Sequence, residues 1–232
     1  MPDLAFQILG VEPAVRGLAP QLHFKLRITA PEGETVEAMI LQVQIQIQSA
    51  RRHYNTAEKE KAGELFGSPE RWGETLRNKL WTIVNTTVGR FAGATEAVLS
   101  VPCTFDLNVI ATKYFTALEE GDVPLLFLFS GTVFHNVGSR LQVEQISWNK
   151  ETAWRMPLEA WREMMDHHYP NTAWITLDRD LFERLHAFKR HTGAVSWDQA
   201  IGCLLDQHET NASQLAQTGA PETNVYEQNI GR

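Results

Sequence analysis

Residues 101–134 read VPCTFDLNVIATKYFTALEEGDVPLLFLFSGTVF, and the apolar run near the end of this stretch decides the fold. From Val123 to Phe129 nearly every residue is apolar, without the period of two that would leave one face polar. Such a run is typical of a central strand that is covered on both faces. A short helix is predicted before it, over 111–119. It should end at Gly121, with that residue at positive φ.

Two further strands show clean alternation. Apolar residues recur at every second position, first at Leu22, Phe24, Leu26 and Ile28, and then at Met39, Leu41, Val43, Ile45 and Ile47. This pattern predicts two half-buried strands, and we expect them to form an antiparallel pair. Glutamine occupies the outward positions 42, 44, 46 and 48. That row is either a binding face or a neutral solvated face.

The remaining chain indicates an α+β fold, a mostly antiparallel β-sandwich of about seven strands with a helical insertion and a helical C-terminal part. The predicted sandwich covers 1–155, and the insertion lies at 56–79, where Thr56 and Ser68 are expected to cap helices. Residues 156–207 are predicted to form helices packed on the sandwich. Residues 208–232 have few apolar side chains, which predicts a disordered tail.

Composition narrows the classes of partner. The 232 residues carry a formal net charge of −7, which argues against nucleic acid or an anionic membrane as the main partner. No run approaches the ~20 apolar residues of a membrane span. The N-terminus has no signal-peptide pattern. We therefore expect a cytoplasmic protein, with Cys103 and Cys203 as thiols rather than a disulfide.

No motif for catalysis or metal binding stands out. Asp166, His167 and His168 are adjacent, and neighbours on a helix point about 100° apart, so they cannot converge on one ion. His186 and His191 are also wrongly spaced to share a helical face. We find no HxxxH, CxxC, GxSxG or glycine-rich phosphate loop. The sequence predicts no catalytic residue, no metal site and no cofactor.

Charged residues offer a candidate interaction surface. Glu119, Glu120 and Asp122 form an acidic turn that a basic partner could recognise, while Arg51 and Arg52 could face an acidic partner. The alternative for both groups is ordinary solvated charge. A tryptophan that proves exposed would be a further anchor for a partner.

Residues 174–206 read as a strand followed by two helices, which resembles a ribbon-helix-helix unit. The strand is predicted at Trp174–Leu177, with helices capped at Asp178 or Asp180 and at Ser196. Such a unit could dimerise or bind DNA. Because carboxylates near the strand repel phosphate, dimerisation is favoured over binding to nucleic acid.

Three segments resemble an uncharacterised family of bacterial proteins: ELFGSPERWGETLRNKLWT at 64–82, the stretch at 101–134 quoted above, and WRMPLEAWREMMDHHYPN at 154–171. Genes of that family tend to lie near those of nickel–iron hydrogenases. The resemblance implies an accessory role in a hydrogenase system, with a hydrogenase subunit or maturation factor as protein partner. It transfers no catalytic residues.

Function is therefore expected to be that of a non-enzymatic accessory or protein-interaction module. One alternative is a small-molecule-binding protein or enzyme, with its site between the sheet and the C-terminal helices. The other is the dimerisation or DNA-binding unit at 174–206.

Overall fold

The computed structural model describes residues 3–104, 109–138 and 140–218. The chain separates into two compact units, Met1–Ala173 and Trp174–Arg232. We call them the sandwich unit and the C-terminal unit. Two mostly antiparallel sheets and several helices confirm the predicted α+β sandwich. The division falls after Ala173, whereas the sequence suggested a boundary after residue 155.

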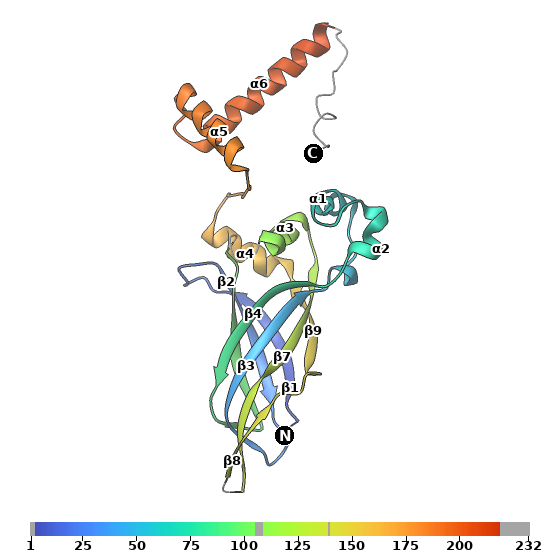
Figure 1. The fold of residues 1–232 in the computed structure, drawn as a ribbon, viewed down its shortest axis with the longest axis vertical. Coiled ribbons are helices and arrows are strands. Elements are labelled where there is room, and N and C mark those ends of the chain that lie inside the picture. The colour runs from blue at the N-terminus through green and yellow to red at the C-terminus, as the bar shows by residue number, and fades with distance from the viewer. Residues whose placement is uncertain (1–2, 105–108, 139, 219–232) are drawn as a thin grey trace. The chain divides into compact units, whose positions relative to one another are not determined.

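The sandwich unit holds both sheets (Figure 1). The three-stranded sheet has the order β1-β2-β6, with β1 at Ala5–Pro13, β2 at Gln21–Thr29 and β6 at Ala94–Pro102. The larger sheet has the order β4-β3-β7-β8, with β3 at Thr35–Ile47, β4 at Lys79–Val88, β7 at Asp122–Val137 and β8 at Arg140–Gln145. Its two remaining strands are the short β5 at Phe91–Ala92, paired with β3, and β9 at Glu151–Pro157, paired with β7.

Strands β2 and β3 do not pair with each other, so the expected antiparallel pair is wrong. Strand β2 pairs with β1 and β6, while β3 pairs with β4, β5 and β7. Their apolar rows are nevertheless almost completely buried and belong to one core. The connection at 30–34 therefore carries the chain from one sheet to the other. Alternation identified the buried face of each strand, but it carries no information about the pairing partner.

Strand β7 is central, but it is fully buried on one face and only partly covered on the other, which corrects the prediction from its apolar run. Phe127 and Phe129 are buried, whereas Leu126 and Leu128 on the opposite face are half-buried. Gly131 lies close to β3 at a φ of 143°, and a Cβ there would lie 2.1 Å from the Ile40 carbonyl oxygen. The close approach of β7 and β3 therefore requires glycine.

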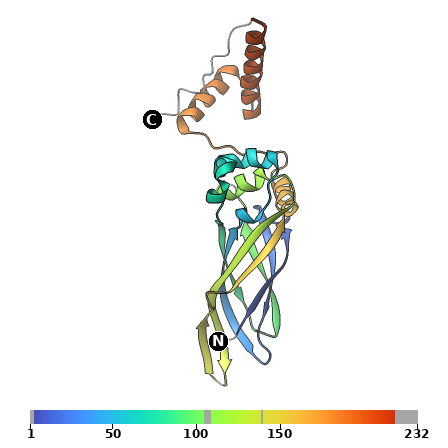
Figure 2. The same ribbon diagram turned by 90° about the vertical axis from the view of Figure 1, so that its right-hand side faces the viewer.

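Helices gather at one end of the sandwich strands (Figures 1 and 2). They are α1 at Thr56–Phe66, α2 at Trp72–Thr75, α3 at Val109–Ala117 and α4 at Leu158–His168, with short 3₁₀ turns η1 at Ser49–Arg51 and η2 at Pro69–Arg71. The predicted insertion is shorter than expected, because α2 ends at Thr75 and β4 begins at Lys79. The Phe115 ring packs against Trp161 at 5.4 Å and Trp81 at 5.0 Å between centroids, which joins α3 to α4 and β4.

Gly121 has the predicted positive φ, at 80°. Helix α3 ends earlier than predicted, at Ala117, so Gly121 belongs to the turn that leads into β7. We call residues 119–122 the rim turn.

The C-terminal unit contains α5 at Arg179–Thr192 and α6 at Trp197–Thr218. Asp178 precedes α5, and Ser196 caps α6 by accepting the Gln199 N–H at 3.1 Å. The predicted strand at 174–177 is not formed, because the structure places none of these residues in a sheet. Helix α6 continues to Thr218, past the start of the predicted tail, and residues 219–232 lie outside the described residues.

None of the described helices is long and apolar enough to span a membrane.

Candidate interaction site at the helical end of the sandwich

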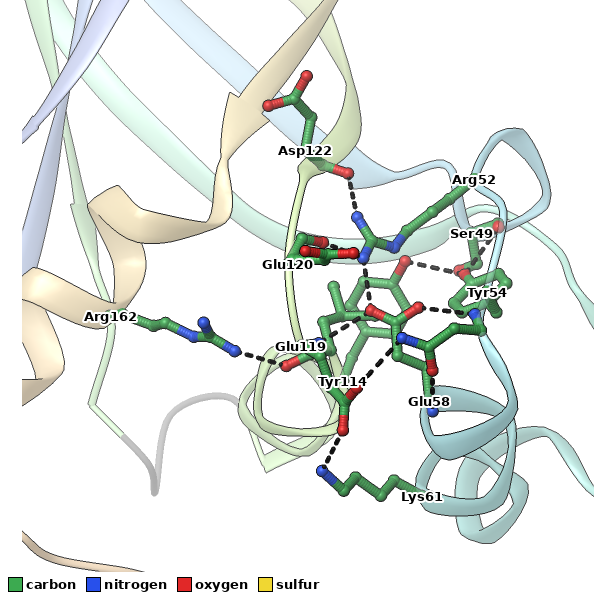
Figure 3. A network of polar contacts seen from close by, with 12 residues as sticks. Ser49, Arg52, Tyr54, Glu58, Lys61, Tyr114, Glu119, Glu120, Asp122 and Arg162 are labelled. Atoms are coloured by element: carbon green, nitrogen blue, oxygen red, sulfur yellow. Dashed lines mark hydrogen bonds and ion pairs between the residues drawn. The ribbon is translucent and has the colours of Figure 1, made fainter.

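A buried ion pair lies at the centre of the helical end (Figure 3). Arg52 Nη2 donates to Glu58 Oε1 at 2.6 Å, and only 7% and 3% of the two side chains are exposed. Arg52 follows the 3₁₀ turn η1, and Glu58 lies in the first turn of α1. A buried pair is stabilised when further hydrogen bonds satisfy its remaining donors and acceptors. Among the described residues these bonds satisfy both Arg52 Nη atoms and both Glu58 oxygens, while Arg52 Nε has no partner.

The local fold explains how Glu58 reaches this position. Asn55 is the N-cap of α1: its side chain accepts the Glu58 N–H at 2.8 Å, and Glu58 Oε2 accepts the Asn55 N–H at 3.1 Å. This reciprocal capping box fixes the Glu58 carboxylate beside the helix N-terminus. The sequence analysis expected Thr56 as the cap, which is off by one residue.

Arg52 and Glu58 together hold the rim turn. Glu58 Oε1 accepts the Glu119 N–H at 2.8 Å, and the Arg52 guanidinium donates to the carbonyl oxygens of Glu120 and Asp122. From α4, Arg162 Nη2 donates to the Leu118 carbonyl oxygen at 2.9 Å (Figure 3). The backbone of the turn is therefore held by charged side chains from two different helical segments.

Two tyrosines attach α3 to this network. Tyr54 donates its hydroxyl proton to the Ser49 carbonyl oxygen at 2.8 Å, and the Tyr54 and Tyr114 hydroxyl oxygens lie 2.9 Å apart. Because Tyr54 has one proton to give, Tyr114 is the donor in the second bond. Burial raises the pKa of both phenols, so both stay neutral at physiological pH.

The ion pair is charged at neutral pH. Burial raises the pKa of Glu58, but the hydrogen bonds from the Glu119 N–H, Arg52 and the Asn55 N–H lower it by more. The net result is a Glu58 pKa below its ordinary value. These donors are fixed by the fold, so they favour the carboxylate without further ordering.

The five residues of the candidate surface lie in different environments. Arg52 is inside the network and contacts the backbone of the rim turn, not its carboxylates. The Glu119 carboxylate accepts from Lys61 Nζ at 3.0 Å and Asn55 Nδ2 at 3.1 Å, and the bond from Lys61 lowers its pKa. The exposed Glu120 and Asp122 carboxylates have no partner among the described residues. Arg51 is exposed, and its carbonyl oxygen accepts from Arg155 at 3.2 Å.

Most residues of the network were not predicted from the sequence. Those that were missed are Asn55, Glu58, Tyr54, Tyr114 and Arg162. The motif Asn55-Thr56-Ala57-Glu58 was readable as a capping box. No comparable signal joins Arg52 to a turn some 70 positions further along the chain. In the part of the chain that the structure describes, no three His, Cys, Asp or Glu side chains cluster as metal ligands would.

These features define a β-sandwich whose helical end is closed by a polar network. The chain belongs to the family of unknown function DUF6084, whose model matches residues 1–213. No curated protein matches the chain.

Solved structures show weak likeness. A late embryogenesis abundant (LEA) protein solved in solution is 14% identical over 68% of this chain and 72% of its own, with a TM-score of 0.28. A β-glucosidase from Kluyveromyces marxianus is 6% identical over 67% of this chain and 15% of its own, with a TM-score of 0.25. β-Glucosidase 3B from Thermotoga neapolitana is 13% identical over 66% of this chain and 17% of its own, with a TM-score of 0.24. Each likeness is too weak to support an inference about function.

Proposed function

We propose that this protein is a non-enzymatic interaction module that binds a basic protein surface through the rim turn. The observation that carries the proposal is the geometry of the turn. Its backbone is held by Arg52 and Glu58, and Arg162 holds Leu118 directly before it, while Glu120 and Asp122 are exposed. A surface that is already ordered before binding loses less conformational entropy when a partner arrives.

Charge defines the kind of partner. Exposed carboxylates without an internal partner attract lysine and arginine, and such contacts increase association rates and specificity more than affinity. The resemblance in three sequence segments motivates a more specific proposal, in which the partner is a subunit or maturation factor of a nickel–iron hydrogenase. That role fits an accessory protein, which acts by binding.

The test is binding of the full chain to purified hydrogenase subunits and maturation factors. Charge reversal at Glu120→Lys with Asp122→Lys should weaken binding at least tenfold and reduce its salt dependence. The matched control is Glu159→Lys with Glu163→Lys, which reverses two exposed charges on α4. Equal loss in both double variants, with unchanged melting temperatures, would reject the rim turn as the interface. Absence of binding to any of these components would reject the hydrogenase partner.

A further inference from the structure

The helical hairpin of the C-terminal unit has well-defined local contacts. The Trp197 ring, at the start of α6, lies 5.4 Å from the Phe182 ring and 5.9 Å from the His186 ring of α5. Lys189 Nζ lies 5.6 Å from the Trp197 ring centroid. Between the helices, Gly193 has a φ of 68° and its N–H bonds to the Arg190 carbonyl oxygen. The connection is therefore a regular glycine-terminated turn.

The hairpin leaves its apolar side chains uncovered. Of residues 174–213, only Ala200 is buried in the part of the chain that the structure describes. Large apolar residues recur at helical spacing and remain exposed, with exposed fractions of 46% at Leu181, 43% at Phe182, 38% at Leu204 and 59% at Leu205. Packing of an apolar face supplies most of the stability of helices in proteins, so a hairpin with this face open gains stability when a partner covers it.

The extended segment before α5 also has an exposed apolar side chain and open backbone groups. Ile175 is 67% exposed, and Ile175, Thr176 and Leu177 form no hydrogen bond with the described residues. Branched and aromatic residues of this kind favour strands. An extended segment whose donors and acceptors are open is a template for pairing with another strand.

A second copy of the same unit fits both open surfaces at once. An antiparallel pair of identical segments can lie on a two-fold axis, so that each copy satisfies the backbone of the other. The two helical hairpins, which follow directly, are then brought together with their apolar faces opposed. An interface of standard size takes about 800 Å² from each partner. The exposed Leu181, Phe182 and Leu205 lie on the surface that such an interface would cover.

The charge balance of residues 174–205 favours association of two copies of this chain. Residues 174–205 contain four acidic residues, Asp178, Asp180, Glu183 and Asp198, and four basic residues, Arg179, Arg184, Lys189 and Arg190. The formal charge of this segment is therefore zero, although that of the whole chain is −7. Two copies do not repel each other here, and the segment has no excess of positive charge to hold nucleic acid.

We propose that residues 174–205 form a two-fold dimer with a second copy of this chain. The extended segments at 175–177 pair as an antiparallel ribbon, and α5 and α6 of each copy pack against those of the other. This interface is separate from the rim turn, so the proposal does not depend on the function suggested above.

The test measures the mass of the full chain by light scattering at micromolar concentration. Wild type should have twice the chain mass of 26.3 kDa. Ile175→Asp and Leu205→Asp, each on an exposed side chain that folding of one copy does not need, should shift the mass to that of one chain. Leu141→Asp is the matched control, because Leu141 is 60% exposed but lies on β8 in the sandwich unit. A monomeric wild type, or a control that dissociates as the two variants do, overturns the proposal.

A second measurement locates the interface. Cys203 on α6 is exposed, whereas Cys103 is buried, with its pKa raised by burial to about 12, so a thiol-reactive spin label should attach at Cys203. Wild type should show a dipolar distance between two labels, and Ile175→Asp should abolish it. A dimer without this distance places the interface elsewhere and rejects the proposal. So does a wild type that is monomeric alone but binds duplex DNA, since the open face would then belong to nucleic acid.

Discussion

The sandwich unit and the C-terminal unit satisfy their apolar and polar groups in opposite ways. In the sandwich unit the inward rows of β2 and β3 are almost fully buried, and even the buried charges Arg52 and Glu58 have partners. In the C-terminal unit, among residues 174–213, Ala200 alone is buried and the segment at 175–177 lacks hydrogen bonds to the described residues. A unit that completes its own core holds its surface turns rigidly, whereas an incomplete one depends on association.

The largest effect should come from breaking the buried ion pair. Glu58→Gln leaves the Arg52 charge buried without a carboxylate and weakens the contact with the rim turn. We expect a loss of about 3–5 kcal/mol in the free energy of unfolding, measured by urea denaturation. The matched control is Glu12→Gln, which removes an exposed ion pair with Lys25 at 2.8 Å and should change stability far less. Equal changes would mean that the network does not stabilise the sandwich unit.

Acid should weaken the same ion pair by protonating Glu58. The loss of stability should be smaller than in Glu58→Gln, because Glu58 is only partly protonated until the pH falls below its lowered pKa. The pKa of Glu58 is lower in the folded protein than its ordinary value of 4.5. Stability from the ionised form is therefore fully present above pH 4.5 and is lost as the pH falls through the lower folded value.

Urea unfolding of wild type and Glu58→Gln between pH 7 and pH 3 measures this contribution. Carboxylates outside the network titrate in both proteins and cancel in the difference, whereas Glu119 feels the Glu58 charge and contributes to the gap. The stability gap between the two proteins should narrow as the pH falls. A gap that stays constant would show that Glu58 contributes no ionised carboxylate to the fold.

The sequence predicted what is local in the sandwich unit and missed what is distant. The presence of α1, the buried rows of β2 and β3 and the positive φ of Gly121 are properties of short segments, and these predictions are confirmed. The predicted pairing of β2 with β3 was wrong, because periodicity identifies the buried face of a strand without identifying the neighbouring strand. Strand β9, at Glu151–Pro157, was missed, because no strand was predicted between the one at 141–148 and the helix that follows.

The candidate site was predictable in part for the same reason. Turn chemistry and charge pointed to the rim turn and to Arg51 and Arg52 as exposed charged groups. Whether an arginine is buried depends on its partners, and those of Arg52 lie in α1 and in the distant rim turn. Sequence spacing alone could not show that Arg52 supports the turn from inside.

A moderate effect is expected from Gly121→Ala, which tests how tightly the rim turn is held. At a φ of 80°, alanine should cost about 1 kcal/mol in stability. Its Cβ would lie 3.5 Å from Arg52 Nη1, an ordinary contact, so an extra loss would come from the Arg52 hydrogen bonds that keep the turn from relaxing. Gly33→Ala is the matched control, with the same φ of 80° and open space around the added atom. Thermal unfolding should show the larger loss for Gly121→Ala. Equal losses would indicate that Arg52 does not restrict the turn.

The smallest effect on the sandwich unit should come from changing the C-terminal unit. Ile175→Asp replaces an exposed side chain outside the sandwich core, so we expect the stability of the sandwich unit to change by less than about 0.5 kcal/mol. Hydrogen exchange read by mass spectrometry can follow the two units separately, because amides report the stability of their own region. Protection of β3 and β7 should match wild type, while α5 and α6 should exchange faster once the dimer is lost. Equal loss of protection in β3 and in α5 would show that the two units unfold as one, and the contrast between a complete and an incomplete unit would then fail.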